Sequence, residues 1–115
     1  KDNIQVIDNA TDRIRKMNGY TYTLKENGIP YAGVIAQEAL EAIPEVVGSA
    51  MKYQDGGSGS KGEEGERYYT VDYSGVTGLL VQVARESDDR ITALEEENAE
   101  LRQRLSAIEA ALASK

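Results

Sequence analysis

The sequence predicts an α+β protein, in which a small globular part with helices and two β-hairpins precedes a long C-terminal helix that forms a parallel coiled coil. Before residue 72 the apolar residues change period several times, and both prolines, Pro30 and Pro44, lie there. After residue 72 there is no proline, and from Ile91 onward the apolar residues recur at steps of three and four. The 115 residues are enough for one domain.

The composition pattern divides this domain into two parts. Residues 1–75 form a globular part, in which residues 46–71 make a long hairpin arm. Residues 76–115 form a C-terminal helix that first packs on the core and then enters a coiled coil over residues 91–112. With the helix set aside, fewer than about 90 residues remain for a core, so the core is small and needs partners.

The first elements are predicted from capping and alternation. Asn3 is a helix N-cap, and the apolar residues that follow step by three, four and three up to the end of the helix at Asn18-Gly19. These apolar residues are Ile7, Ala10, Ile14 and Met17. Residues 20–24 and 30–36 then alternate around the turn Asn27-Gly28, which predicts a β-hairpin.

A short helix from Gln37 is predicted next, because Ala39, Leu40 and Ile43 share one side of it before Pro44 ends it. Residues 46–53 and 67–71 read as strands. Between them, residues 55–66 hold five glycines and four acids with no apolar side chain, a composition typical of a flexible hairpin tip. Asp72 is the predicted N-cap of the C-terminal helix.

The coiled coil is predicted by core and flanks together. With Ile91 at position a, every a and d position is filled without a missed step: Ile91, Leu94, Asn98, Leu101, Leu105, Ile108 and Leu112. The g-to-e contacts would pair Arg90 with Glu95, Glu97 with Arg102, and Arg104 with Glu109, all of opposite sign. Asn98 favours a dimer or fixes register, whereas Leu105 at a and Ile108 at d favour more strands, so this pattern leaves dimer and trimer open.

Nearer the core, Leu79, Leu80 and Val83 are predicted to extend this oligomer interface toward the globular part. A single amphipathic helix folded back on its own domain is the alternative reading of the same pattern.

Composition excludes several functions. Cysteine and histidine are absent, which removes thiolate metal sites, disulfides and the usual general base, and we expect neither a metal nor a cofactor. The formal charge of -7 disfavours nucleic acid and anionic membranes as partners. No apolar run approaches the roughly 18 residues of a membrane span.

Several groups of residues could form a functional site, but each also has a simpler structural explanation. Gln37 and Glu38 could be a catalytic pair, but an acid at a helix start also faces the positive end of the dipole. Thr11 and Lys16 are five residues apart and would diverge by about 140° on a helix, which disfavours a dyad. Tyr68, Tyr69 and Tyr73 could form a binding face, or two of them could be half-buried strand residues.

Five blocks in this order resemble the intramolecular chaperone domain of bacteriophage tail fibres and tailspikes, the peptidase S74 family. They are residues 1–4 (KDNI), 19–22 (GYTY), 33–38 (GVIAQE), 44–47 (PEVV) and 70–73 (TVDY). Such domains trimerise, promote folding of the fibre shaft upstream of them during virion assembly, and are released by self-cleavage. The resemblance therefore implies a homotrimer, with a dimer less expected, whose other partner is the upstream shaft of the same precursor.

The family cleaves before the serine of a Ser-Asp-x-Arg-x-Lys segment with a Ser-Lys dyad. By this resemblance Lys1 is the general base, and the serine would lie five residues upstream of it, outside the chain. The chain as given should then be unable to cleave itself. The expected location is the host cytoplasm during assembly, with release from the mature virion fibre.

The long hairpin resembles the arms with which these domains contact the shaft. The residues expected to make this contact are Tyr53, Asp55, Gly56, Gly57, Glu63, Glu64 and Arg67. A plain oligomerisation module without a chaperone or protease role is the alternative, and a hydrolase acting in trans is disfavoured by the missing serine. A membrane-anchored transcription factor with this fold would need a membrane span after Lys115.

Overall fold

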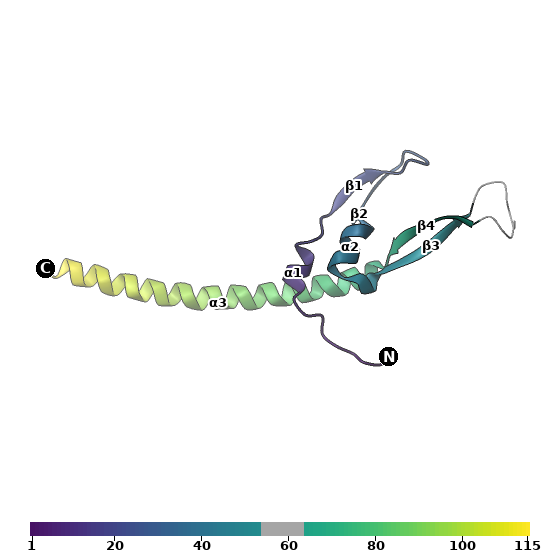
Figure 1. Cartoon of the computed structure of the whole chain (residues 1–115). Coiled ribbons are helices and arrows are strands. Elements are labelled where there is room, and N and C mark those ends of the chain that lie inside the picture. The colour runs from purple at the N-terminus through teal and green to yellow at the C-terminus, as the bar shows by residue number, and fades with distance from the viewer. Residues whose placement is uncertain (54–63) are drawn as a thin grey trace.

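The computed structural model describes the backbone of residues 1–53 and 64–115, and the side chains of these except residues 50–53 and 64–67. A small body of short elements sits at one end of a long helix, and the molecule measures 90 × 39 × 17 Å (Figure 1). The predicted α+β class, with two β-hairpins and a long C-terminal helix, is confirmed.

The N-terminal helix is shorter than predicted. Residues 1–9 form neither helix nor strand, and α1 spans only Ala10–Ile14. The prediction of a helix capped by Asn3 is wrong, because Asn3 and Asn9 both have left-handed backbone conformations, with φ of 55° and 50°. The predicted apolar positions still face the core, where Ala10 and Met17 are buried. Their spacing therefore reflects burial of a mostly irregular segment.

The first hairpin is confirmed. β1 (Tyr20–Thr23) pairs antiparallel with β2 (Pro30–Gly33), with Tyr22 opposite Tyr31. Gly28 takes a positive φ of 67° in the connecting loop, and the side-chain oxygen of Asn27 accepts a hydrogen bond from the Ile29 N–H at 2.9 Å. β2 ends at Gly33, three residues earlier than predicted.

The junction after β2 is compact. α2 spans Ala36–Ala42, so the predicted short helix is confirmed and starts one residue earlier. Pro44 occupies the first turn of η1, a 3-10 helix over Pro44–Val46, where its missing N–H costs nothing.

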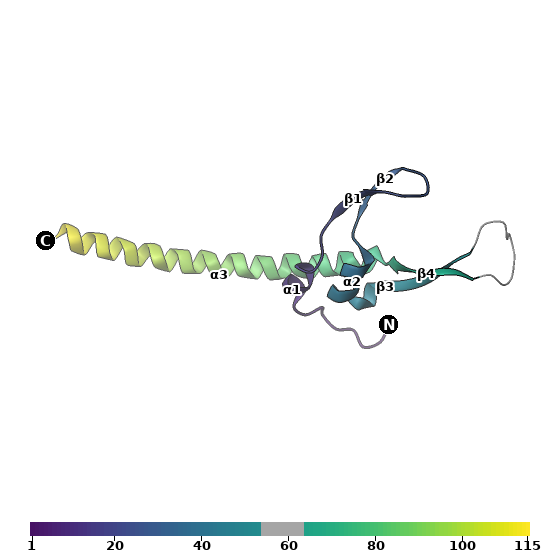
Figure 2. The same ribbon diagram turned by 45° about the horizontal axis from the view of Figure 1, so that its top comes forward.

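The second hairpin is also confirmed. β3 (Val47–Tyr53) pairs antiparallel with β4 (Glu64–Val71), beginning with Val47 opposite Val71, and the register is irregular between Met51 and Tyr53. β4 starts three residues earlier than predicted. The hairpin extends away from the C-terminal end of the long helix (Figures 1 and 2).

α3 spans Tyr73–Ala113, 41 residues or about 60 Å. Its predicted cap is confirmed, because the Asp72 carboxylate accepts a hydrogen bond from the Ser74 N–H at 3.0 Å. The absence of proline after residue 44 allows this uninterrupted length.

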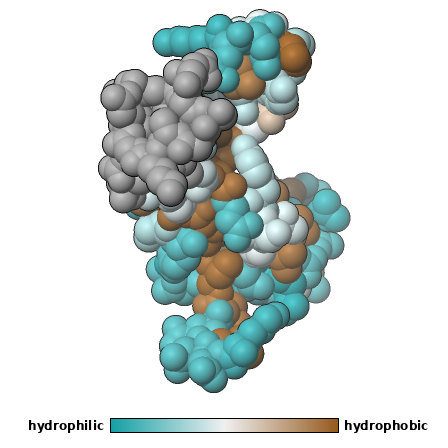
Figure 3. Space-filling model, turned by 90° about the vertical axis from the view of Figure 1, so that its right-hand side faces the viewer, coloured by the Kyte–Doolittle hydropathy of each residue, from teal (hydrophilic) through white to brown (hydrophobic). Residues whose placement is uncertain are grey.

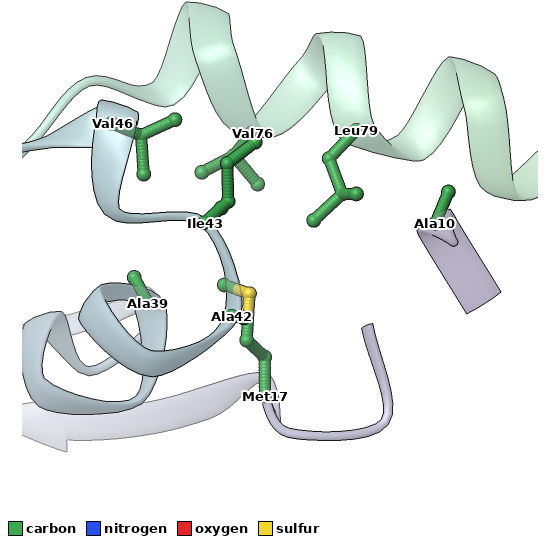
Figure 4. Packing of buried hydrophobic residues seen from close by; sticks show 8 residues of the cluster. All are labelled: Ala10, Met17, Ala39, Ala42, Ile43, Val46, Val76 and Leu79. Carbon is green, nitrogen blue, oxygen red and sulfur yellow. The ribbon is translucent and has the colours of Figure 1, made fainter. Parts of the chain in front are cut away.

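The core lies where the first turns of α3 meet α1, α2 and η1 (Figure 4). Its eight buried residues are Ala10, Met17, Ala39, Ala42, Ile43, Val46, Val76 and Leu79. Three of them are alanines, so the body buries little apolar side chain within one chain.

Candidate functional site

No part of the chain that the structure describes covers the C-terminal two-thirds of α3. All residues from Asp88 to Lys115 are exposed. They include the large apolar residues of the predicted seam, with exposed fractions given in parentheses: Ile91 (55%), Leu94 (55%), Leu101 (51%), Leu105 (56%), Ile108 (57%) and Leu112 (64%). A stripe of six large apolar residues in a/d spacing, left exposed on an extended helix, has the pattern typical of a coiled-coil surface.

Nearer the body, α3 presents two different faces. Leu79 is completely buried in the core, whereas its neighbour Leu80 is 50% exposed. The two side chains point in different directions because consecutive residues on a helix are about 100° apart. Counting back from Ile91 in a/d steps gives Ser87, Ala84, Leu80, Thr77 and Tyr73, so Leu80 continues the seam.

Val83 belongs to the other face of α3. It is partly buried and packs against the core of its own chain. Its predicted contact with another copy stays a prediction.

The charged flanks of the seam are available for pairing. Arg104 lies 2.7 Å from Glu100, one turn earlier on the same helix, and both side chains are mostly exposed. Such a pair contributes about 0.5 kcal/mol or less, so it can be exchanged for a contact between helices.

Lys1 and three of the predicted arm residues lie within the described part of the chain. Lys1 is exposed at the start of the irregular segment 1–9. Tyr53 lies in β3, and Glu64 and Arg67 lie in β4. The remaining predicted arm residues, Asp55, Gly56, Gly57 and Glu63, lie outside the described residues.

Glu38 joins β1 to α2. Its carboxylate accepts hydrogen bonds from the Tyr20 hydroxyl at 2.7 Å and from the Asn18 N–H at 3.1 Å. The hydrogen bond to Glu38, together with partial burial, raises the pKa of Tyr20 above its usual value. Glu38 thus has two structural partners, and Gln37 beside it is exposed, as the structural interpretation of this pair expects.

Glu86 was not identified from the sequence. Its carboxylate accepts hydrogen bonds from the N–H groups of Ala10 at 2.7 Å and Thr11 at 2.9 Å, which are the first free donors of α1. The adjacent Thr11 side chain and these two N–H groups lower the pKa of Glu86. Glu86 lies 76 residues from Ala10, so no local pattern could reveal it.

The second link of α1 is Arg13. Its guanidinium donates to the Ala42 carbonyl at 3.1 Å and to the Asp8 carboxylate at 3.0 Å. α1 is therefore attached to α3 through Glu86 and to α2 through Arg13, and the irregular N-terminal segment leaves the body at a fixed point.

Within residues 1–53 and 64–115, the structure contains no group of three or more Asp, Glu, His or Cys side chains placed to hold a metal ion. Among the described helices, none combines the length and apolarity needed to cross a membrane.

Comparison with known proteins agrees with the resemblance found in the sequence. Residues 1–48 match the family Peptidase_S74, described as chaperone of endosialidase. Long tail fiber protein Gp37 of Escherichia phage AR1 is 35% identical over 88 residues, covering 69% of this chain and 7% of that protein. The chain thus spans a small part of a much longer relative.

The fold and these similarities define a domain of the chaperone class. The chain belongs to the Peptidase_S74 family.

Proposed function

We propose that this domain is an intramolecular chaperone of a phage tail fibre or tailspike, which trimerises through α3 and aligns the upstream shaft for folding. The exposed seam carries this proposal, because it leaves six large apolar residues uncovered in a chain that otherwise buries a small core. The family description and the tail fibre relative supply the shaft as the other partner.

Such a trimer would hold the three shaft chains in alignment while they fold. Long chains that must wind together lose much entropy in finding a common register, and tethering their ends makes the search local. Asn98 in the seam and the three oppositely charged flank pairs would define one register, because a buried amide and the charges are satisfied only when the helices are aligned.

The proposed chemistry follows the family resemblance. Lys1 accepts a proton from the serine hydroxyl five residues upstream in the precursor, and the serine oxygen attacks the carbonyl carbon of the preceding residue. The C–N bond breaks, the serine nitrogen takes up a proton and leaves as a free amine, and water hydrolyses the ester that remains. The proposed setting is the host cytoplasm during assembly, and the domain leaves the mature fibre after cleavage. Residues 1–9 lie outside any helix or strand and are mostly exposed, which supports an accessible segment next to the proposed cleavage point.

The oligomeric state is tested by sedimentation equilibrium of the purified chain and two matched variants. Wild type should have the mass of three 12.5 kDa chains. Leu101→Asp places a carboxylate at a d position and should give monomers, because three like charges would be desolvated together. Gln103→Asp makes the same change in charge at the outward f position and should leave the trimer intact. A monomeric wild type would contradict the proposal.

The chaperone role is tested in a precursor that includes the shaft. Lys1→Met should leave shaft folding intact and stop release of the domain, as observed by gel electrophoresis. Deletion of residues 56–65 should impair shaft folding and leave trimerisation intact, if the hairpin arm contacts the shaft. A shaft that folds equally well without the domain would instead indicate a plain oligomerisation module.

A further inference from the structure

The β1–β2 hairpin has one apolar face, which we call the hairpin face. Side chains alternate across a strand, and Tyr22 lies opposite Tyr31, so both strands direct the same set of residues to one side. The Leu24 N–H donates to the Ile29 carbonyl at 3.2 Å, which continues the pairing by one step. On one side lie Tyr20 and Gly33 at the root, followed by Tyr22, Leu24, Ile29 and Tyr31, and these last four make up the hairpin face; the opposite side carries Thr21, Thr23, Pro30 and Ala32.

Within the described residues, nothing covers the hairpin face completely. Its exposed fractions are 38% for Tyr22, 37% for Leu24, 49% for Ile29 and 43% for Tyr31. None of the four is part of the core or packs against it. The two tyrosine rings stack on each other, with centroids 6.2 Å apart, and Figures 1 and 2 show the hairpin projecting from the body.

Two-stranded hairpins are marginally stable in water unless another element covers their apolar face. The end-on view shows apolar surface on the projecting hairpin at the top of the molecule and again along the middle (Figure 3).

The hairpin starts on the seam side of α3. Tyr73 is the d position that continues the seam to the first turn of the helix. Its hydroxyl lies 3.3 Å from the Val34 N–H, and a side chain at Gly33 would collide with it. Because d positions face the common axis of a coiled coil, the proposed trimer would place the root of the hairpin beside that axis. In that assembly a neighbouring copy would lie within reach of the hairpin.

Charge also favours a second copy as the occupant. The chain carries a net charge of -7, so copies repel one another unless they meet through neutral surfaces. Both strands of the hairpin are free of charged residues, and so is the whole of α3 from Tyr73 to Ala84. In that part of α3, Leu80 and Val81 are 50% and 55% exposed.

Val81 departs from the pattern of its heptad position. The e positions of α3 are Ser74, Val81, Asp88, Glu95, Arg102 and Glu109, and Val81 alone among them is apolar. An e side chain flanks the neighbouring helix and is usually charged. An apolar residue here indicates that this level of the assembly is covered by more than the helical seam.

We propose that the hairpin face packs on the neighbouring copy, against the uncharged first turns of its α3 at Leu80 and Val81. This inference rests on the proposed trimer, and it makes the hairpin part of the oligomer interface. Each copy then completes the apolar cover of the next, which compensates for the small core within one chain.

The inference is tested by hydrogen exchange and by dilution of the purified full chain. Amides of β1 and β2 should exchange about tenfold or more slowly in the wild-type oligomer than in the Leu101→Asp monomer, while α2 amides report whether the body of the monomer stays folded. Tyr31→Ser and Val81→Ser should each raise the dissociation constant about tenfold, as expected for an anchor residue. The matched control Thr21→Ser, on the opposite face, should leave it unchanged.

The outcomes separate the two proposals. If wild type is oligomeric but Tyr31→Ser and Val81→Ser associate as wild type does, the hairpin inference is wrong and the trimer stands. Equal protection of the hairpin in the oligomer and in a folded monomer would lead to the same conclusion. If wild type is monomeric at high concentration, the proposed function fails and the hairpin inference fails with it. Loss of α2 protection in Leu101→Asp leaves the dilution series as the deciding measurement.

Discussion

Replacing Leu79 or Leu80 with alanine makes the same chemical change at adjacent positions with opposite environments. Leu79 is 0% exposed and lies between Val76 and Ala10 in the core (Figure 4). Truncation of a fully buried leucine costs about 2–5 kcal/mol, from lost apolar burial and from the cavity left behind. Leu80 is 50% exposed in the single chain, so its truncation there should cost about 1 kcal/mol, half of the value for complete burial.

The assay is urea unfolding followed by circular dichroism, for both variants in wild type and in the monomeric Leu101→Asp background. Leu79→Ala should be strongly destabilising in both backgrounds. Leu80→Ala should be mild in the monomer and approach the cost of Leu79→Ala in the oligomer, where the seam buries its side chain. A mild Leu79→Ala, or equal costs for the two leucines in the monomer, would refute the assignment of the two faces of α3.

Two further predictions concern the attachment of the body to α3. Gly75→Ala should destabilise the body, because the added Cβ would collide with the Val46 side chain. Gly78→Ala should stabilise the body by about 0.5–1 kcal/mol, because the nearest atom lies 3.8 Å from the added Cβ and alanine favours helix. Thermal melts should therefore shift in opposite directions for the two variants, and equal shifts would contradict the packing. The pKa of Glu86 is lowered in the folded state from its ordinary value of 4.5, so its contribution is fully present above that pH and is lost as the pH falls through the folded-state value. Glu86→Gln should flatten this acid-side slope of stability, and an unchanged slope would show that Glu86 does not hold α1.

Much of the fold was predictable because its causes are local. The turn at Asn27-Gly28, the stop at Pro44 and the cap at Asp72 each depend on the conformational preference or hydrogen bonding of a few neighbouring residues. The seam was predictable for the same reason, since a heptad repeat marks one face of a helix whatever lies beside it. Its pairing with other copies remains a prediction.

Only the tertiary structure determined which surface of each element packs in the core and which stays exposed. α1 is short and begins at Ala10 because the carboxylate of Glu86, 76 residues away, supplies its first hydrogen bonds, and the asparagine predicted as its cap does not. Apolar periodicity identified both Leu79 and Leu80 as contact residues, but which one faces the chain's own core depends on where α1 and α2 pack. Sequence thus determined what each segment forms, because backbone preferences act over a few residues, whereas long-range packing determined which apolar surface remains for a partner.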